Sequence, residues 1–368
     1  MKAVVVEDAN KVVVREVPDP PPPGPYQALT RNVCASICNS TDLKIAHRTL
    51  YFVRDYPTIL GHEGVGRVIE VGEKVRNFHV GDLVTRPHVN PPPADGAPPA
   101  GGAPPESGLH ESWGAFADYG IVTDTWAMAA DGLIEIKPER LPDQIPAPPD
   151  ADPVALTQMI TLRETLSLLC NMGVQPSDSI VVFGTGPVGV AFSMLARQIG
   201  LDPVIVVGRR DGPLDRARTF GRATHVINNA RESVPRAVRE LTGGRGADWA
   251  IEAIGTNAVM SDALACVGEP GQVALYGVPD ASEVNSPLRR GRCAVCGPHI
   301  SPAQPNEGAA ATEVLNLVSR GRIPAREFVT HELPMAEVAA GLRLLETRQA
   351  FKVLLWIEQG QLPISTLS

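Results

Sequence analysis

Long apolar runs are missing from this sequence. None of its 368 residues falls in an uninterrupted apolar stretch of about 18 positions, the length that a membrane-spanning helix needs. Residues 1–14 alternate apolar with charged side chains, whereas a signal peptide carries a continuous apolar stretch. We therefore expect neither a transmembrane segment nor a secretory leader.

Cysteine is scarce and positive charge is outnumbered. The six cysteines are scattered over the chain: Cys34, Cys38, Cys170, Cys266, Cys293 and Cys296. This usage suits a reducing compartment, the cytoplasm, in which a special cysteine is a ligand or a catalyst and not half of a disulfide. Lys and Arg total 33 against 41 for Asp and Glu, and the net charge of −8 argues against nucleic acid or an anionic membrane as a partner.

The composition that remains is that of a globular protein with more than one core. Hydrophobic residues make up 43% and charged residues 20% of the chain. Because 368 residues are too many for one ordinary core, we expect two domains. The proline-rich stretch from Pro142 to Pro149 indicates a boundary near residue 150. We expect one domain over residues 1–150, a second over 151–300, and a C-terminal segment over 301–368 that rejoins the first domain.

The segment from Ser179 to Arg210 has the pattern of one β-α-β unit. Apolar, β-branched runs cover Ile180–Phe183 and Val204–Val207. Between them, apolar residues recur at the helical spacings of three and four: Val188, Ala191, Leu195 and Ile199. A length of about 30 residues is typical of a single β-α-β unit.

A glycine-rich turn joins the first of these strands to the helix. Gly184 permits a sharp turn, Gly186 leaves room for a diphosphate beside the backbone, and Gly189 allows the helix to pack closely. The free N–H groups and the positive dipole end of the helix attract phosphate. We predict that this turn, with Pro187 and Val188, binds a dinucleotide.

The end of the second strand indicates which dinucleotide. An Asp or Glu at this position grips the ribose 2′-hydroxyl of NAD, but the sequence here is Gly208-Arg209-Arg210. Glycine leaves space for a larger group, and guanidinium pairs with phosphate through two parallel hydrogen bonds. We therefore predict NADP(H), held by Gly208, Arg209 and Arg210.

Strand and helix patterns continue to alternate after this unit. Further strands are expected at His225–Ile227, Trp249–Ile254 and Gln272–Gly277, with helices such as Ser233–Leu241 and Asn257–Cys266 between them. Strict alternation of this kind is typical of a doubly wound parallel sheet. The N-terminal residues instead form short strands, and a further strand is expected over Trp113–Val122. A helix is expected from Pro153 through Leu169, with Asp152 as its cap, and helices at 307–320 and 335–347 precede a last strand, Lys352–Ile357.

Two segments of the N-terminal half carry groups suited to catalysis. The polar turn Cys38-Asn39-Ser40-Thr41-Asp42 is expected to open a short helix, with Ser40 or Thr41 as its N-cap. The stretch from Leu60 to Gly72 alternates apolar with small or polar residues, as a strand of a small barrel does, and it contains His62 and Glu63.

The chain as a whole resembles the medium-chain dehydrogenase/reductase superfamily, in its zinc-type alcohol, sorbitol and threonine dehydrogenase branch. The motifs that carry the resemblance are the Cys38 turn, Gly61-His62-Glu63-Gly64-x-Gly66, Glu70-Val71-Gly72, Gly81-Asp82, the Gly184 turn, Gly246-Ala247-Asp248 leading to Ile251–Gly255, and Lys352-Val353. The resemblance implies a Rossmann domain, together with a GroES-like barrel that the C-terminus completes. It places the active site in the cleft between them.

The resemblance also implies a catalytic zinc ion. Cys38 and His62 would bind it, and Glu63 would be a neighbouring or exchangeable carboxylate. Ser40 or Thr41 would relay a proton to solvent, and Asp42 would orient the site.

The sequence departs from the family pattern in the zinc ligands. The Cys38 turn is one residue longer than the commonest form, so the identity of the relay hydroxyl stays open. The third zinc ligand, Cys or Glu in the family, is replaced by Ile160 or Gln158, depending on the alignment. Residues 85–115 contain no cysteine, so a structural zinc is not expected, and a Pro- and Gly-rich excursion, Pro91–Pro105, stands in its place.

One further cysteine pair has metal-ligand spacing. Cys293-x-x-Cys296 lacks the second pair that a complete site needs, and the family has a strand here. We interpret it as part of a packed strand.

Three functions agree with these features. The first is an NADP(H)-dependent, zinc-type oxidoreductase acting on a secondary alcohol or ketone, such as a polyol, sugar or cyclitol, and forming a homodimer or homotetramer. The second is a zinc-free reductase of an activated C=C bond, which the missing third ligand favours and the presence of Cys38, His62 and Glu63 opposes. The third is a protein that binds NADPH without catalysis.

Overall fold

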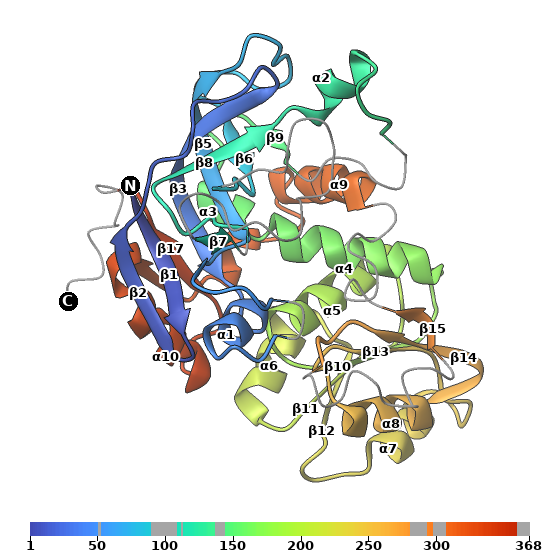
Figure 1. Cartoon of the computed structure of the whole chain (residues 1–368). Helices are drawn as coiled ribbons and strands as arrows, with labels where there is room; N and C mark the ends of the chain where they lie inside the picture. Colours follow the sequence, from blue (N-terminus) through green and yellow to red (C-terminus); the bar gives the residue numbers. More distant parts are fainter. Residues whose placement is uncertain are drawn as a thin grey trace. The chain divides into compact units, whose positions relative to one another are not determined.

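The computed structural model describes residues 1–50, 53–89, 109–111, 113–136, 144–279, 293–296 and 307–358 (Figure 1). The excursion expected at Pro91–Pro105 lies outside these residues. The chain divides into two compact units, one made of Met1–Ile160 and Leu317–Ser368 and the other of Thr161–Asn316. The first division falls inside helix α4 and the second inside helix α9, later than the proline-rich boundary suggests.

The unit formed by Thr161–Asn316 is built around a parallel sheet. Its strands are β10 (Ile180–Phe183), β11 (Val204–Gly208), β12 (His225–Asn228), β13 (Ala247–Glu252), β14 (Val267–Leu275) and β15 (Cys293–Cys296). They pair in the order β12-β11-β10-β13-β14-β15, with every recorded pairing parallel. This order reverses direction beside β10, as in the doubly wound dinucleotide-binding fold, and the expected fold class is confirmed.

Helices cover both faces of this sheet (Figure 1). They are α5 (Pro187–Ile199), α6 (Asp211–Thr219), α7 (Val234–Leu241) and α8 (Asn257–Cys266), with α4 (Met159–Met172) and α9 (Glu307–Ser319) at the divisions between the units. Val234 and Val238 of α7 pack with Met260 and Ala263 of α8 against alternate residues of β10 and β11. Successive side chains of a strand point to opposite faces of the sheet, so these residues share one face. Because helices cover both faces, the central strands need apolar side chains at every position.

The glycine-rich turn has the conformation that its sequence predicts. Gly184 follows β10 with φ +135°, a region that favours glycine. A Cβ atom on Gly189 would lie 2.0 Å from the carbonyl oxygen of Gly184, so only glycine permits this approach of helix to turn.

The other unit contains two sheets. Strands β1 (Lys2–Asp8), β2 (Lys11–Glu16), β4 (Thr58–Ile59) and β7 (His110–Glu111) form one of them, in the order β2-β1-β4-β7. The larger sheet has the order β16-β17-β3-β5-β6-β9, with β8 also paired to β3. Its strands are β16 (His331–Pro334), β17 (Val353–Trp356), β3 (Gln27–Ile37), β5 (Glu63–Val71), β6 (Leu83–Thr85), β9 (Pro146–Ala147) and β8 (Tyr119–Thr123). Because β17 pairs antiparallel with β3, the last described strand completes a sheet begun by the N-terminal half.

Short helices flank these sheets. They are α1 (Thr41–Ala46), α2 (Thr125–Ala130), α3 (Pro153–Thr157) and α10 (Val338–Glu346), with 3-10 turns at Ala325–Phe328 and Met335–Glu337. In the part of the chain that the structure describes, no helix has both the length and the apolar character of a membrane span.

Two local expectations need correction, and a third is confirmed only in part. The helix expected from Pro153 through Leu169 is two helices, because α3 ends at Thr157, with Gln158 as its C-cap, and α4 begins at Met159. The strand expected from Trp113 starts only at Tyr119, since Trp113 and Gly114 have φ of +70° and +81°, outside the extended region. Ser40 occupies the N-cap position of α1, but its side chain makes no capping hydrogen bond.

Candidate active site

Four polar side chains meet at one end of the strands β17, β3 and β5. In the sheet register, Ser36 of β3 lies opposite Glu63 of β5 and opposite Leu354 of β17. Because both neighbours run antiparallel to β3, the end of β3 lies beside the beginnings of β5 and β17. Cys38 follows the end of β3, while the pair His62-Glu63 and Lys352 stand at the beginnings of the other two strands.

Cys38, His62 and Glu63 form a cluster that fits a metal ion. One ligand atom from each residue lies within 4.8 Å of the others: a sulfur, a ring nitrogen and a carboxylate oxygen. His62 and Glu63 are buried and Cys38 is partly exposed. Thiolate, imidazole and carboxylate are the three ligand types that zinc binds in proteins. The structure therefore brings together the three residues that the sequence predicts as metal ligands.

Asp42 braces this cluster from helix α1. It is fully buried, and its Oδ2 accepts a hydrogen bond of 2.8 Å from the backbone N–H of Cys38. Its Oδ1 lies 3.4 Å from Nδ1 of His62. A carboxylate beside one ring nitrogen fixes the tautomer of a histidine and leaves its other nitrogen available as a ligand. Asp42 thus holds the position expected of an orienting residue.

The electrostatics of the cluster attract a cation. Burial lowers the pKa of His62, but the nearby Asp42 carboxylate and Cys38 outweigh it, and the pKa is raised well above its ordinary value. The negative potential that stabilises a protonated imidazole would equally stabilise a metal ion.

Lys352 contributes a buried charge that the sequence motifs did not assign to the site. Its Nζ lies 2.5 Å from Oε2 of Glu63, and both side chains are 2% exposed. Burial alone would lower the pKa of Lys352, but the Glu63 carboxylate counteracts burial and the net shift is upward. The side chain therefore keeps its ammonium form. The sequence shows only a lysine directly before an apolar strand, and its burial becomes visible in the structure alone. Glu63 is therefore shared between a cation of the chain and the candidate metal site.

Gln158 lies against the same strand end. Its Nε2 donates hydrogen bonds of 2.8 Å to the hydroxyls of both Ser36 and Thr157. The Thr157 hydroxyl donates to the carbonyl of Val154, and the two hydroxyls lie 2.8 Å apart. Since the proton of Thr157 is directed to Val154, Ser36 donates to Thr157 and both hydroxyls accept from Gln158.

This accounting orients the Gln158 amide. Both of its N–H groups are used, which leaves the carbonyl oxygen Oε1 as its remaining polar atom. Gln158 is 1% exposed, and it contacts the residue directly opposite Glu63. Ile160, the other alternative for the third ligand position, is a buried apolar side chain of α4 without a ligand atom.

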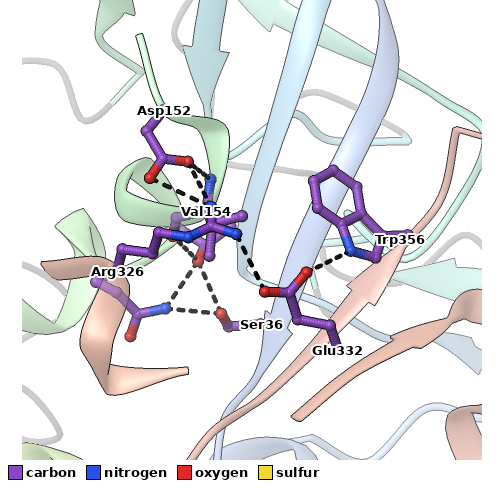
Figure 2. A network of polar contacts seen from close by, with 8 residues as sticks. Ser36, Asp152, Val154, Arg326, Glu332 and Trp356 are labelled. Atoms are coloured by element: carbon purple, nitrogen blue, oxygen red, sulfur yellow. Dashed lines mark hydrogen bonds and ion pairs between the residues drawn. The ribbon is translucent and has the colours of Figure 1, made fainter. Parts of the chain in front are cut away.

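A polar network connects the start of helix α3, at Asp152 and Val154, to the C-terminal strands (Figure 2). Asp152 caps helix α3 by accepting from the backbone N–H of Val154, and Arg326 donates to Asp152 at 3.0 Å and to Glu332 at 3.2 Å. Glu332 also accepts from the ring N–H of Trp356 at 2.9 Å. The short helix that carries Gln158 is thus tied to strands β16 and β17 by side chains.

Ser40 and Thr41 are less closely tied to the cluster. Both are half-buried at the start of α1, and no hydrogen bond of either hydroxyl is recorded within the described residues. The proton-relay role of either residue stays a prediction.

The candidate nucleotide site lies in the other unit. Gly186 is exposed at the N-cap of α5, Pro187 is the first helical residue, and a Cβ at Gly186 would meet no atom within 4 Å. Open space in front of the N-terminus of this 13-residue helix suits a diphosphate. Val188 follows on the first turn of the same helix.

The end of β11 has no room for an acidic side chain. A Cβ at Gly208 would lie 2.5 Å from the methyl group of Thr185, so a larger residue here requires the Thr185 side chain to move. Arg209 and Arg210 are exposed, and within the described residues neither guanidinium has a recorded hydrogen bond or ion pair. Both are therefore available to an anionic ligand.

Cys293 and Cys296 lie in strand β15, which pairs in parallel with β14. A strand is the backbone conformation that we expected for this cysteine pair.

Comparisons with known proteins agree with this arrangement. Residues 24–135 match the family model of the alcohol dehydrogenase GroES-like domain, and residues 187–311 match that of the zinc-binding dehydrogenases. The first match contains Cys38, His62 and Glu63, and the second begins inside the glycine-rich turn.

Individual relatives extend the likeness over nearly the whole chain. The chain is 32% identical over 349 residues to a probable zinc-binding alcohol dehydrogenase of Mycobacterium tuberculosis, which covers 95% of this chain and 86% of the relative. It is 27% identical to an NADP-dependent isopropanol dehydrogenase of Thermoanaerobacter brockii, over 84% of this chain and 86% of that one. The solved alcohol dehydrogenase TADH from Thermus sp. ATN1 superposes with a TM-score of 0.78 at 29% identity, covering 97% and 100% of the two chains.

The buried pair of Lys352 and Glu63 gives a stability prediction. Lys352→Met leaves Glu63 buried without its cation, which should cost about 3–5 kcal/mol of unfolding free energy. Urea denaturation of chelator-treated protein measures this cost without interference from bound metal. The double variant Lys352→Met/Glu63→Gln should recover much of the loss, because no unpaired charge is left.

Lys11→Met is the matched control. Lys11 is also paired with a glutamate, Glu7, at 2.7 Å, but its side chain is 64% exposed, so its loss should change stability far less. Equal effects of the two lysine substitutions would contradict the buried pair.

Proposed function

Because the chain belongs to the zinc-type alcohol dehydrogenase branch of the medium-chain dehydrogenase/reductase superfamily, we propose that it transfers hydride between NADP(H) and a secondary alcohol or ketone. A polyol, a sugar or a cyclitol is the substrate class that we infer. The observation that supports this proposal best is the grouping of Cys38, His62 and Glu63 within 4.8 Å.

In this proposal, Cys38 and His62 hold a zinc ion. When bound, zinc supplies Lewis-acid polarisation of the substrate oxygen. Asp42 keeps the His62 ring in place and accepts from the backbone of Cys38, so both ligands are positioned before the ion arrives. Ser40 or Thr41 passes the proton of the substrate hydroxyl toward solvent.

Glu63 and Gln158 complete the donor set. Glu63 contributes a carboxylate whose charge is shared with Lys352, and we propose Gln158 Oε1 as a neutral donor in place of the family's Cys or Glu. A catalytic zinc keeps one of its four positions for water or substrate. Glu63 would therefore be the exchangeable donor, and its position would pass to the substrate oxygen while Cys38, His62 and Gln158 hold the ion.

The cofactor in this proposal is NADP(H). Its diphosphate binds at the N-terminus of α5, where Gly184, Gly186 and Gly189 keep the turn open. Its 2′-phosphate pairs with Arg209 and Arg210, beside Gly208. The NADP-dependence of the Thermoanaerobacter brockii relative supports the same choice. We further infer a cytoplasmic homodimer or homotetramer.

Metal analysis combined with turnover tests the proposed reaction. Purified protein should contain one catalytic zinc per chain, oxidise secondary alcohols with NADP+, and lose activity after chelation. Zinc-free protein that reduces an activated C=C bond, indifferent to chelator, would contradict the proposal in favour of the C=C reductase. NADPH binding without turnover on alcohols, sugars or enones would identify a non-catalytic binding protein.

Arg209→Ala tests the cofactor assignment. Loss of a charged hydrogen-bond donor to phosphate should weaken NADPH binding by about tenfold or more, since such bonds contribute about 1.5–3 kcal/mol. Binding of NADH should stay within the error of the wild type, because NADH has no 2′-phosphate. Fluorescence titration with each nucleotide measures both constants, and an unchanged NADPH affinity would contradict this role of Arg209.

A further inference from the structure

An acidic residue stands in the loop where the proposed 2′-phosphate binds. Strand β11 ends at Gly208 and helix α6 begins at Asp211, so Asp211 directly follows the two arginines. In the sheet, Gly208 pairs with Asn228, the last residue of β12, and the carbonyl of Gly208 accepts from the backbone N–H of Asn229. Asp211 and the end of β12 are thus neighbours.

Both carboxylate oxygens of Asp211 are bound from the β12 side. Oδ1 accepts from Nδ2 of Asn228 at 2.8 Å, and Oδ2 accepts from the guanidinium of Arg231 at 2.6 Å. The side-chain hydrogen bonds from Asn228 and Arg231 lower the pKa of Asp211, so the group is ionised at neutral pH. Arg231 follows β12 closely, and its backbone N–H donates to the carbonyl of Asn228, which fixes the turn that carries it.

A carboxylate without a partner in this loop would favour NAD(H) over NADP(H). A carboxylate near the end of the second strand accepts from the 2′- and 3′-hydroxyls of NAD ribose, and it repels a 2′-phosphate. We propose that Arg231 and Asn228 sequester Asp211 and thereby set the preference for a 2′-phosphorylated cofactor, with Arg231 as a positioning residue that does not itself touch the phosphate. This inference rests on the proposed NADP(H) function.

Other charged groups near the loop also affect how strongly it attracts a phosphate. A hollow of about 480 Å³ beside Arg209 is also lined by Glu232 and Asp262. With Asp211 paired to Arg231, Arg209 and Arg210 are the charges of the loop for which the described residues show no ion pair, and Arg209 shares the hollow with the two acids. Release of Asp211 would add a third negative charge to the same neighbourhood, and the attraction for phosphate would fall.

Arg231→Gln tests the inference, with nucleotide fragments as probes. 2′,5′-ADP carries the 2′-phosphate and 5′-AMP lacks it, so their dissociation constants isolate this end of the cofactor. Removal of Arg231 should weaken 2′,5′-ADP and NADPH by about three- to tenfold, the effect of one unit of charge acting through water-exposed surface. Binding of 5′-AMP and NADH should stay unchanged or become tighter, because Asp211 is released to accept from the ribose.

The double variant Arg231→Gln/Asp211→Asn separates the sequestered acid from a direct contact. If Arg231 acts through Asp211, the double variant should bind 2′,5′-ADP within about twofold of the wild type. A loss that persists in the double variant would show that Arg231 contacts the phosphate itself, and would overturn the inference.

Arg236→Gln is the matched control, since Arg236 is another exposed arginine paired with an acid, Glu240 at 2.9 Å on helix α7. Equal behaviour of the Arg231 and Arg236 variants would also overturn the inference. A wild-type protein that binds NADH as tightly as NADPH would instead refute the NADP(H) assignment, and the sequestering role would fall with it.

Discussion

The register of three strands is the constraint on which the candidate active site depends. Strand β3 runs antiparallel to both β5 and β17, and this arrangement brings the end of one strand beside the beginnings of two others. Residues from three distant parts of the sequence, Cys38, Glu63 and Lys352, meet there as a result. A shift of β17 by one residue would turn Lys352 away from Glu63 and leave a buried carboxylate unpaired.

The same strand end is organised by the balance of its buried charges. Glu63 faces a chain cation, Asp42 faces the imidazole of His62, and Gln158 adds a neutral amide. Each buried charge therefore lies beside a group of complementary character, while the sulfur, nitrogen and oxygen atoms of the cluster lie close together. A cation placed among them would meet ligands that are already oriented, which reduces the cost of ordering them.

Sequence patterns predict the parts of this protein that depend on local structure. The β-α-β unit and its glycine-rich turn follow from periodicity, and Cys38, His62 and Glu63 follow from short motifs. Lys352 is different, because its importance comes from a partner in another strand, and no local pattern shows that pairing. The break at Gln158 is also non-local: it accompanies hydrogen bonds to Ser36, a residue of another element. The sequestering of Asp211 by Arg231 depends in the same way on the pairing of β11 with β12.

The most direct test of the central claim is zinc K-edge X-ray absorption of the purified, zinc-loaded protein. The account predicts a shell with a single sulfur at about 2.3 Å, together with nitrogen and oxygen ligands at about 2.0–2.2 Å. In the Cys38→Ser variant the sulfur contribution should disappear. A zinc shell without sulfur in the unaltered protein, or a sulfur shell that survives in Cys38→Ser, would contradict the account.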